Sequence, residues 1–334
     1  MSISFDRSAQ TASFHSPLED FEAVEIEVEV REDPLTGRQA RIVPESFLKA
    51  EDPDIEAVVA DDEDCFFCPG TVEDVTPKYP EWVGMDRGSV GEATSFPNLN
   101  PYGAHSNVVA LTDAHYKPID AFERTDFRDG LAAALEYIER VVEHDTEAAF
   151  ASVNMNFLRS AGSSIVHPHL QTLVDGRGTN RQRELTTAAG RFAAEHDEAY
   201  WEALVETERD GDRWVGSTGT VDWLAAFAPH HHRQIVGVGE TAGIPAPGSE
   251  VVADLATGIV NVLDYYGEAG LNAFNLAWHL SADEPGMRPV LELVARSVFD
   301  EYYWSDSPFF TVLHDEGVVD EAPETVATEA SAFF

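Results

Sequence analysis

The chain has 334 residues, 43% of them hydrophobic, so it is long enough to form one large globular domain or two of ordinary size. Acidic residues outnumber basic ones by 61 to 21, which gives a formal net charge of -40. Because such a charge repels phosphate backbones and anionic lipid surfaces, we exclude nucleic acid and membranes as expected partners. The acidic residues are spread along the chain, as in proteins adapted to high salt, where a Debye length of roughly 3 Å or less screens self-repulsion.

The sequence also predicts a cytoplasmic location. The N-terminal residues lack the basic start and apolar core of a signal peptide, and no later window approaches about 18 uncharged apolar residues. Both cysteines lie in one Cys65-x-x-Cys68 unit, so none remains for a long-range disulfide.

The first part of the chain combines predicted strands with irregular structure. Residues 1–20 are polar and without period, which indicates an N-terminal arm that is mobile or forms an edge contact. Residues 24–30 alternate between apolar and acidic side chains, the pattern of a half-buried strand, and a second strand is expected near 38–43. Glycine and proline are frequent between residues 69 and 101, which favours a long irregular loop region.

Regular structure is predicted again from residue 106. Strands are expected at 106–111 and 149–157, with a helix between them that starts at residue 119 or 127 and ends at His144. A strand that carries His167 and His169 follows.

The second half of the chain repeats this order of elements. A polar helix is expected at 180–208, followed by a strand at 235–238, a helix at 251–266 and strands at 273–279 and 289–298. This repetition suggests an internal duplication.

Cys65 and Cys68 have the spacing of half a tetrahedral zinc site, which imidazoles from elsewhere in the chain would complete. A redox dithiol and two buried cysteines are the alternatives. Pro69 and Gly70 follow the pair directly, so no helix begins there as it would in a thioredoxin-like motif. The pattern therefore favours a metal site.

The run His167-Pro168-His169 with Gln171 brings two imidazoles and an amide together. Residues two apart in a strand face the same side, and Pro168 stiffens the backbone. Two metal ligands, one ligand with one catalytic histidine, and two structural histidines are the open assignments. A histidine nucleophile needs one ring nitrogen free and the other held, commonly by a backbone carbonyl.

Two further clusters of polar residues could contribute to a site. Gly162, Ser163 and Ser164 form a small turn that could offer N–H and hydroxyl donors to a phosphoryl group as charge develops on it. The triple His230–His232 is interpreted as a surface feature or as support behind a site, because consecutive residues face opposite sides of a strand. Contact with a phosphate is the alternative for this triple.

Four motifs, taken in this order, resemble those of the galactose-1-phosphate uridylyltransferase family in the histidine-triad superfamily. They read Arg31-Glu-Asp-Pro-Leu-Thr-Gly37, Cys65-Phe-Phe-Cys-Pro-Gly70, Ala110-Leu-Thr-Asp-Ala-His115 and Gly162-Ser-Ser-Ile-Val-His-Pro-His-Leu-Gln171. The resemblance spans about residues 25–175 and continues more loosely to about 320.

The resemblance implies an α+β fold of two tandem histidine-triad-like units, with a mostly antiparallel, half-barrel sheet flanked by helices. After the arm of residues 1–20, it implies a catalytic unit with the zinc site at 21–178. A degenerate, substrate-side unit would follow at 179–334.

The resemblance also implies a role for each site residue. The zinc ligands would be Cys65, Cys68, His115 and His167; the catalytic residues His169, Gln171 and Ser164; and the substrate-binding residues Arg31, Asn156, Gly162 and Ser163. His169 would be the nucleophile, Gln171 and Ser164 would hold the transferred phosphoryl group, and Arg31 would face the nucleotide phosphates.

The implied reaction is a ping-pong double displacement of galactose metabolism, in which UMP passes from a UDP-sugar through a covalent nucleotidyl-histidine to a sugar 1-phosphate. An adenylyltransferase or phosphorylase, a nucleotide hydrolase of the same superfamily, and a zinc-stabilised nucleotide-binding protein without catalysis are the alternatives. A nucleotide sugar and a sugar 1-phosphate are the implied partners, and a homodimer is implied by analogy.

Two departures from the family pattern affect these expectations. Thr94-Ser95 stands before Phe96 where the family has an Asn-Asp pair that contacts the nucleoside, which leaves the nucleobase open. Some members hold a second metal with a His-x-His in the C-terminal half; here His279 is present, but Glu292-Leu-Val294 replaces the His-x-His. We therefore predict no second metal of that type.

Overall fold

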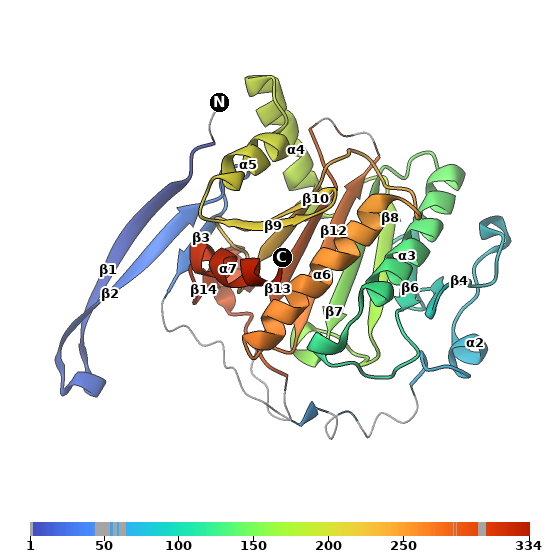
Figure 1. The fold of residues 1–334 in the computed structure, drawn as a ribbon, viewed down its shortest axis with the longest axis horizontal. Coiled ribbons are helices and arrows are strands. Elements are labelled where there is room, and N and C mark those ends of the chain that lie inside the picture. Colours follow the sequence, from blue (N-terminus) through green and yellow to red (C-terminus); the bar gives the residue numbers. More distant parts are fainter. Residues whose placement is uncertain are drawn as a thin grey trace.

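A computed structural model describes residues 3–43, 54–55, 59, 65–282, 284, 286–299 and 305–334. Ten strands form its central sheet: β4 (Gly88–Val90), β5 (Ala93–Pro97), β6 (His105–Ala110), β7 (Phe150–Phe157), β8 (His169–Asp175), β9 (Trp214–Thr218), β10 (Val221–Ala225), β11 (Ile235–Gly239), β12 (Phe274–Ser281) and β13 (Val290–Ala295). They lie in the order β4-β5-β6-β8-β7-β12-β13-β11-β10-β9, and every neighbouring pair is antiparallel (Figure 1).

The strand order is the same in the two halves of this sheet. From edge to centre, β4, β5, β6, β8 and β7 in the first half match β9, β10, β11, β13 and β12 in the second, and β7 pairs with β12 where the halves meet. In chain order, one long helix follows the third strand of each half: α3 (Arg124–His144) lies between β6 and β7, and α6 (Glu250–Glu268) lies between β11 and β12. The predicted α+β class with tandem units and a mostly antiparallel sheet flanked by helices is thus confirmed.

Helices α3 and α6 cover one face of the sheet, which we call the α3 face. Each helix buries apolar residues three or four positions apart, the pattern of a helix that packs on a core: Phe127, Leu131, Leu135 and Ile138 in α3, and Leu255, Ile259, Val262 and Tyr266 in α6. They pack against inward side chains of the strands such as Val153, Leu170 and Trp278. Figure 1 shows the two helices side by side across the sheet.

The opposite face, which we call the α4 face, is covered only in part. Helices α4 (Asn180–His196) and α5 (Tyr200–Arg209) pack on the strands of the second half through a smaller apolar cluster that includes Leu185, Leu224 and Val236. Because opposed residues of antiparallel strands point to the same side, one row of side chains crosses this face: Val108, Gln171, Asn154, Ala277, Glu292 and Val236.

A second, four-stranded sheet consists of β1 (Asp6–Ser16), β2 (Glu22–Glu32), β3 (Gln39–Ile42) and β14 (Gly317–Val319). Strands β1 and β2 form a hairpin that projects from the rest of the molecule (Figure 1). Strand β14 pairs with β3 in parallel, and the short helix α7 (Pro323–Ala330) follows it, so residues near the C-terminal end lie beside residues 39–42.

Several elements differ from the predicted ones. The arm expected at 1–20 contains β1, whose residues are almost all exposed and therefore show no apolar period. The expected loop region at 69–101 contains the short helix α2 (Val72–Val75) and the hairpin of β4 and β5. Strands β9 and β10 were not predicted either; tertiary pairing rather than local sequence determines such short strands.

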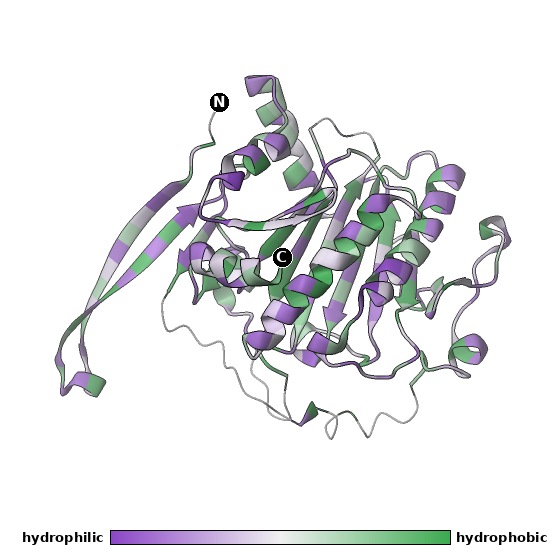
Figure 2. Cartoon of the chain, in the orientation of Figure 1, coloured by the Kyte–Doolittle hydropathy of each residue, from purple (hydrophilic) through white to green (hydrophobic). Residues whose placement is uncertain are grey.

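Hydrophobic and hydrophilic residues are interleaved along α3 and α6 (Figure 2). Within the described ranges, no helix combines the length and the apolar composition needed to cross a lipid bilayer.

Candidate functional site

Strand β8 brings His169 and Gln171 to the α4 face. The strand begins at His169, so His167 lies just before it and does not continue the row that an uninterrupted strand would give. Gln171 lies opposite Asn154 of β7, and His169 lies opposite Ala110 of β6. Leu170 faces the other way, into the core beneath α3. The alternation of the strand therefore separates the reactive side chains from the core.

The ring of His169 is held in one tautomer by the backbone. Its Nδ1 lies 2.8 Å from the carbonyl oxygen of His167. A carbonyl can only accept, so Nδ1 carries the proton and Nε2 keeps its lone pair. Burial lowers the pKa of His169, although the hydrogen bond to His167 opposes this effect. A neutral imidazole with a free Nε2 is the form that can act as a nucleophile.

Phe67, from the loop that carries both cysteines, packs against this histidine pair. Its ring centroid lies 5.3 Å from that of His169 and 6.1 Å from that of His167, in both cases edge to face. Phe67 also contacts Phe96 of β5 at 5.3 Å. The cysteine loop and the histidine strand are therefore packed as one unit.

The four predicted zinc ligands lie together. The ligand atoms of Cys65, Cys68, His115 and His167 are all within 4.8 Å of one another. Nδ1 of His167 is 3.7 Å from each sulfur, and Nδ1 of His115 is 3.5 Å from Sγ of Cys68. Tetrahedral zinc with ordinary bond lengths places sulfur and nitrogen ligands about 3.6 Å apart. The cluster thus has the donor set and the spacing of a site that could hold zinc.

The other ring nitrogen of His167 fixes its orientation. Nε2 lies 2.7 Å from the carbonyl oxygen of Thr112, so Nε2 donates and the lone pair of Nδ1 faces the two thiols. Burial lowers the pKa of His167 to about 4, which keeps the ring neutral. Burial, followed by the charge of Cys65, raises the pKa of Cys68 to about 11. A divalent cation would reverse the effect on the thiols, which fits these residues as its ligands.

The turn of residues 162–164 lies beside this site and is tied to β12. Gly162 has φ +90°, a conformation that favours glycine, although a Cβ there would meet no neighbouring atom within 4 Å. Asn275 of β12 donates to Asn156 at 2.7 Å and to the carbonyl of Ala161 at 2.9 Å. The turn and the predicted substrate residue Asn156 are therefore connected through one amide.

The two serines of the turn differ. The hydroxyl of Ser163 is buried and donates to the carbonyl of Ile165 at 2.6 Å. The N–H groups of Gly162 and Ser163 donate to the carbonyls of Arg159 at 3.0 Å and Leu158 at 3.1 Å, so the predicted N–H donors are used within the turn. Ser164 is exposed, which leaves its hydroxyl accessible. The catalytic role predicted for Ser164 stays a prediction.

The structure does not place Arg31 with these residues. Its side chain is 1% exposed, and its guanidinium donates to Glu324 of α7 at 2.8 and 2.9 Å and to Glu29 at 2.6 Å. It also lies 4.8 Å from the ring centroid of Phe227. Within the chain, Arg31 joins the hairpin to α7, and this position gives no support to the predicted contact with nucleotide phosphates.

Two of the consecutive histidines are buried rather than on the surface. His231 is 8% exposed and His232 is 6% exposed, and Nδ1 of His232 lies 2.7 Å from a carboxylate oxygen of Asp320. The interpretation of these two residues as surface residues is therefore wrong. The loop that connects β10 to β11 buries them, and His232 contacts Asp320, which follows β14. His230 is only partly buried and faces a cavity with Gln234.

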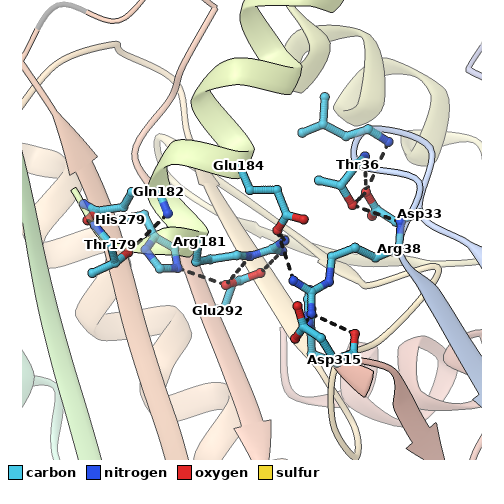
Figure 3. A network of polar contacts seen from close by, with 12 residues as sticks. Asp33, Thr36, Arg38, Thr179, Arg181, Gln182, Glu184, His279, Glu292 and Asp315 are labelled. Atoms are coloured by element: carbon cyan, nitrogen blue, oxygen red, sulfur yellow. Dashed lines mark hydrogen bonds and ion pairs between the residues drawn. The ribbon is translucent and has the colours of Figure 1, made fainter. Parts of the chain in front are cut away.

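A polar network on the α4 face was not found by sequence reasoning (Figure 3). Glu292 accepts from Arg181 at 2.7 Å, from Gln234 at 3.2 Å and from His279 at 2.9 Å. Burial alone would raise the pKa of Glu292, but Arg181 and His279 outweigh it and hold that pKa well below its usual range. The signal available in the sequence was a glutamate among the apolar residues of the strand Val290–Ala295.

The predicted nucleoside-contact position is divided between the two faces of the sheet. Thr94 lies opposite Ala110, which lies opposite His169, so Thr94 is on the α4 face. Ser95 is buried on the α3 face, where the hydroxyl of Tyr79 donates to it at 3.3 Å. Of these two residues, only Thr94 is on the face where a ligand bound near His169 would lie.

A protein of Archaeoglobus fulgidus with the description "Uncharacterized protein" is 35% identical to this chain over 304 residues, which cover 90% of this chain and 91% of that protein. The chain belongs to the family of this archaeal protein. No family model matches the chain.

Solved structures show the fold that this family adopts. An ADP-glucose phosphorylase from Arabidopsis thaliana with bound ADP-glucose has a TM-score of 0.70 and 17% identity, over 91% of this chain and 98% of that chain. A galt-like protein from Arabidopsis thaliana also has a TM-score of 0.70, at 16% identity over 90% and 98%. A uridylyltransferase structure has a TM-score of 0.64 and 20% identity over 91% and 98%. The chain thus shares its fold with these ADP-glucose phosphorylase, galt-like and uridylyltransferase structures.

Proposed function

We propose that the protein is a nucleotidyltransferase that works through a covalent nucleotidyl-histidine, most simply a hexose-1-phosphate uridylyltransferase. The observation that carries this proposal is the state of His169: its Nδ1 is held by the carbonyl of His167, so its Nε2 keeps a lone pair, and Gln171 lies two residues along the same strand. A purely structural metal site would need neither residue. The likeness in fold to an ADP-glucose phosphorylase and to a uridylyltransferase supports the same reaction class.

In the first half-reaction, Nε2 of His169 attacks the phosphorus next to the nucleoside of a nucleotide sugar. A P–N bond forms, the P–O bond to the sugar phosphate breaks, and a sugar 1-phosphate leaves. The amide of Gln171 donates to a phosphoryl oxygen as charge develops on it. In the second half-reaction, a phosphate oxygen of another sugar 1-phosphate attacks the same phosphorus and releases His169.

We propose zinc at the cluster of Cys65, Cys68, His115 and His167. With four protein ligands and no open position, the ion would have a structural task. Because His167 is a ligand and also holds Nδ1 of His169 through its carbonyl, the site would orient the nucleophile.

An adenylyltransferase or a phosphorylase is the second candidate. Of the two residues that replace the family's Asn-Asp pair, Thr94 lies on the same face as His169, and a threonine hydroxyl can hydrogen-bond to either base. A neighbour in fold with bound ADP-glucose favours the same candidate.

Intact-protein mass spectrometry tests the reaction class and identifies the base. Wild-type protein incubated with UDP-glucose or with ADP-glucose should gain the mass of one uridylyl or one adenylyl group, and His169→Ala should gain neither. Retention of the adduct by His169→Ala would refute the proposed nucleophile. If the wild type forms no adduct with any nucleotide donor while it binds stoichiometric zinc, a non-catalytic nucleotide-binding protein becomes the better description.

We propose in addition that the chain works in the cytoplasm of a salt-adapted cell, as its charge suggests, and that two copies form a homodimer by analogy with the family. The domain boundary proposed at residues 178 and 179 lies between β8 and α4, where the second half of the repeated strand order begins.

A further inference from the structure

Four polar side chains are hydrogen-bonded in series across the α4 face, and we call them the polar relay: Asp306, Arg296, Asn275 and Asn156. Asn275 of β12 and Asn156 of β7 lie directly opposite each other in the sheet. Asn154, two residues before Asn156, lies opposite Gln171 of β8. Continuing this antiparallel register by two residues would bring Asn156 level with His169. The relay therefore ends beside the proposed nucleophile.

The other end of the relay is an ion pair. The guanidinium of Arg296 donates to Asp306 from Nε at 2.9 Å and from Nη2 at 2.5 Å. Asp306 also accepts from the N–H of Ser297 at 2.7 Å, and only 4% of its side chain is exposed. Burial alone would raise the pKa of Asp306, but hydrogen bonds and nearby charge, chiefly those of Arg296, lower it. The carboxylate is therefore ionised at neutral pH, and its two contacts fix the plane of the guanidinium.

The guanidinium of Arg296 sets the orientation of the Asn275 amide. The third nitrogen, Nη1, lies 2.5 Å from Oδ1 of Asn275. A guanidinium has only donors, so the amide must present its oxygen to it. Nδ2 of Asn275 then donates to Oδ1 of Asn156 at 2.7 Å and to the carbonyl of Ala161 at 2.9 Å. The carbonyl of Ala161 can only accept, so it requires the same orientation of Asn275 independently of Arg296.

The orientation of Asn275 in turn fixes that of Asn156. Because Nδ2 of Asn275 donates, the atom of Asn156 that faces it must be the oxygen. Asn156 is exposed, and its Nδ2 has no hydrogen-bond partner among the residues that the structure describes. Asn156 therefore offers a donor, rather than an acceptor, to a ligand at the level of His169.

A donor at this position suits a phosphoryl group under attack. The non-bridging oxygens of the phosphoryl group gain negative charge in the transition state, and an N–H that already points at them stabilises this charge without reorganisation. An amide that was turned over would present its oxygen to the same charge and repel it. The ion pair at the far end of the relay prevents this turn before any ligand binds.

We propose that Arg296 and Asn275 are positioning residues, which hold the amide of Asn156 so that its N–H donates to a non-bridging oxygen of the transferred phosphoryl group. The proposal rests on the proposed function, because that function puts the phosphorus at His169. Neither positioning residue needs to touch the ligand, and Arg296 lies just beyond the end of β13.

A double-mutant cycle on the full chain tests the proposal. Rapid-quench mass spectrometry measures the rate of adduct formation at saturating UDP-glucose or ADP-glucose. Asn275→Asp keeps an acceptor for Arg296 but has no N–H for Asn156, so it should slow adduct formation about tenfold. Asn156→Ala removes the donor itself and should slow adduct formation about 100-fold. Because Asn275 acts through Asn156, adding Asn275→Asp to Asn156→Ala should slow the reaction by less than a further factor of about two.

Two more variants complete the set. Arg296→Lys keeps the positive charge but lacks the planar fork that reaches Asp306 and Asn275 together, so it should also slow adduct formation only when Asn156 is present. Asn100→Asp is the matched control for Asn275→Asp, because Asn100 is exposed in the loop between β5 and β6, at the end of β6 away from His169. It should leave the rate unchanged. Zinc content should match the wild type in every variant, since none of these residues is among the clustered ligands.

The results separate this inference from the proposed reaction. A normal rate in Asn275→Asp, or rate losses that multiply in the double variant, would overturn the positioning role even if the wild type forms its adduct. If the wild type forms no adduct, the transferase reaction is contradicted, and calorimetric titration with UMP and AMP applies the same cycle to affinity. Losses of affinity that do not add would then support the positioning of Asn156, whereas additive losses, or no binding, would overturn it.

Discussion

Gln171 and His169 are not among the four clustered metal-ligand candidates, and their side chains lie on the α4 face rather than in the core beneath α3. Their positions two apart on β8 could be predicted from the sequence, because alternation along a strand is local. The separate tasks of His167 and His169 came only from the family resemblance, and the structure adds the carbonyl contacts of both rings. The partners of Arg31 could not be predicted, because Glu324 is 293 positions away in the chain.

At the scale of single residues, Gln171→Ala should slow formation of the nucleotide adduct about 100-fold or more, the effect of removing one donor to a developing anion. Zinc content should stay at the wild-type level, because Gln171 is not among the four clustered ligands. Rapid-quench mass spectrometry measures the rate, and elemental analysis measures the zinc. A normal rate in Gln171→Ala would remove this residue from the proposed mechanism.

At the scale of elements, long regular segments were easier to predict than short ones. The helix at α3 and the strands at β7 and β12 are long enough for periodicity to identify them. The hairpin of β4 and β5 lies in a glycine- and proline-rich stretch, where pairing with β6 supplies what local propensity does not. The cavity on the α4 face is lined by residues of α4 and β13, which are far apart in the chain, so no local sequence pattern predicts it.

The link between the hairpin and α7 predicts a dependence on acid. Burial alone would raise the pKa of Glu324, but hydrogen bonds and charge from Arg31 lower it to about 2. A carboxylate whose pKa is depressed by folding stabilises the fold at pH values above its pKa in the unfolded chain. This contribution is lost as the pH falls from about 4.5 towards 2. Glu324→Gln should therefore cost on the order of 2 kcal/mol of unfolding free energy at pH 7 and little near pH 2. Urea unfolding across this pH range measures it, and a cost that does not change with pH would contradict the role of the ion pair.

At the scale of the whole molecule, we predict that the formal net charge of -40 makes stability depend on salt. Self-repulsion in dilute buffer destabilises the compact state, and multimolar salt screens it. Transfer to tens of millimolar salt should therefore reduce the circular dichroism signal of the helices and restore it when salt is added back. An unchanged spectrum at low salt would contradict salt adaptation.

The proposed zinc site should add to the stability of the molecule at neutral pH, where its ligands can bind the ion. Removal of zinc by a chelator should lower the unfolding temperature, because four ligands from distant parts of the chain lose their common partner. Differential scanning calorimetry with and without added zinc measures the change. His115→Ala should reproduce the chelated protein, whereas His144→Ala, a histidine at the end of α3, should not.

The proposed mechanism gives His167 and His169 different roles, and locating the nucleotide on the chain shows which of them is the nucleophile. Wild-type protein labelled with a nucleotide sugar would be digested at neutral or alkaline pH, and the modified peptide sequenced by mass spectrometry. We expect the nucleotide on His169 alone, with full zinc content in His169→Ala and loss of zinc in His167→Ala. A nucleotide on His167, or on any residue other than His169, would contradict the account.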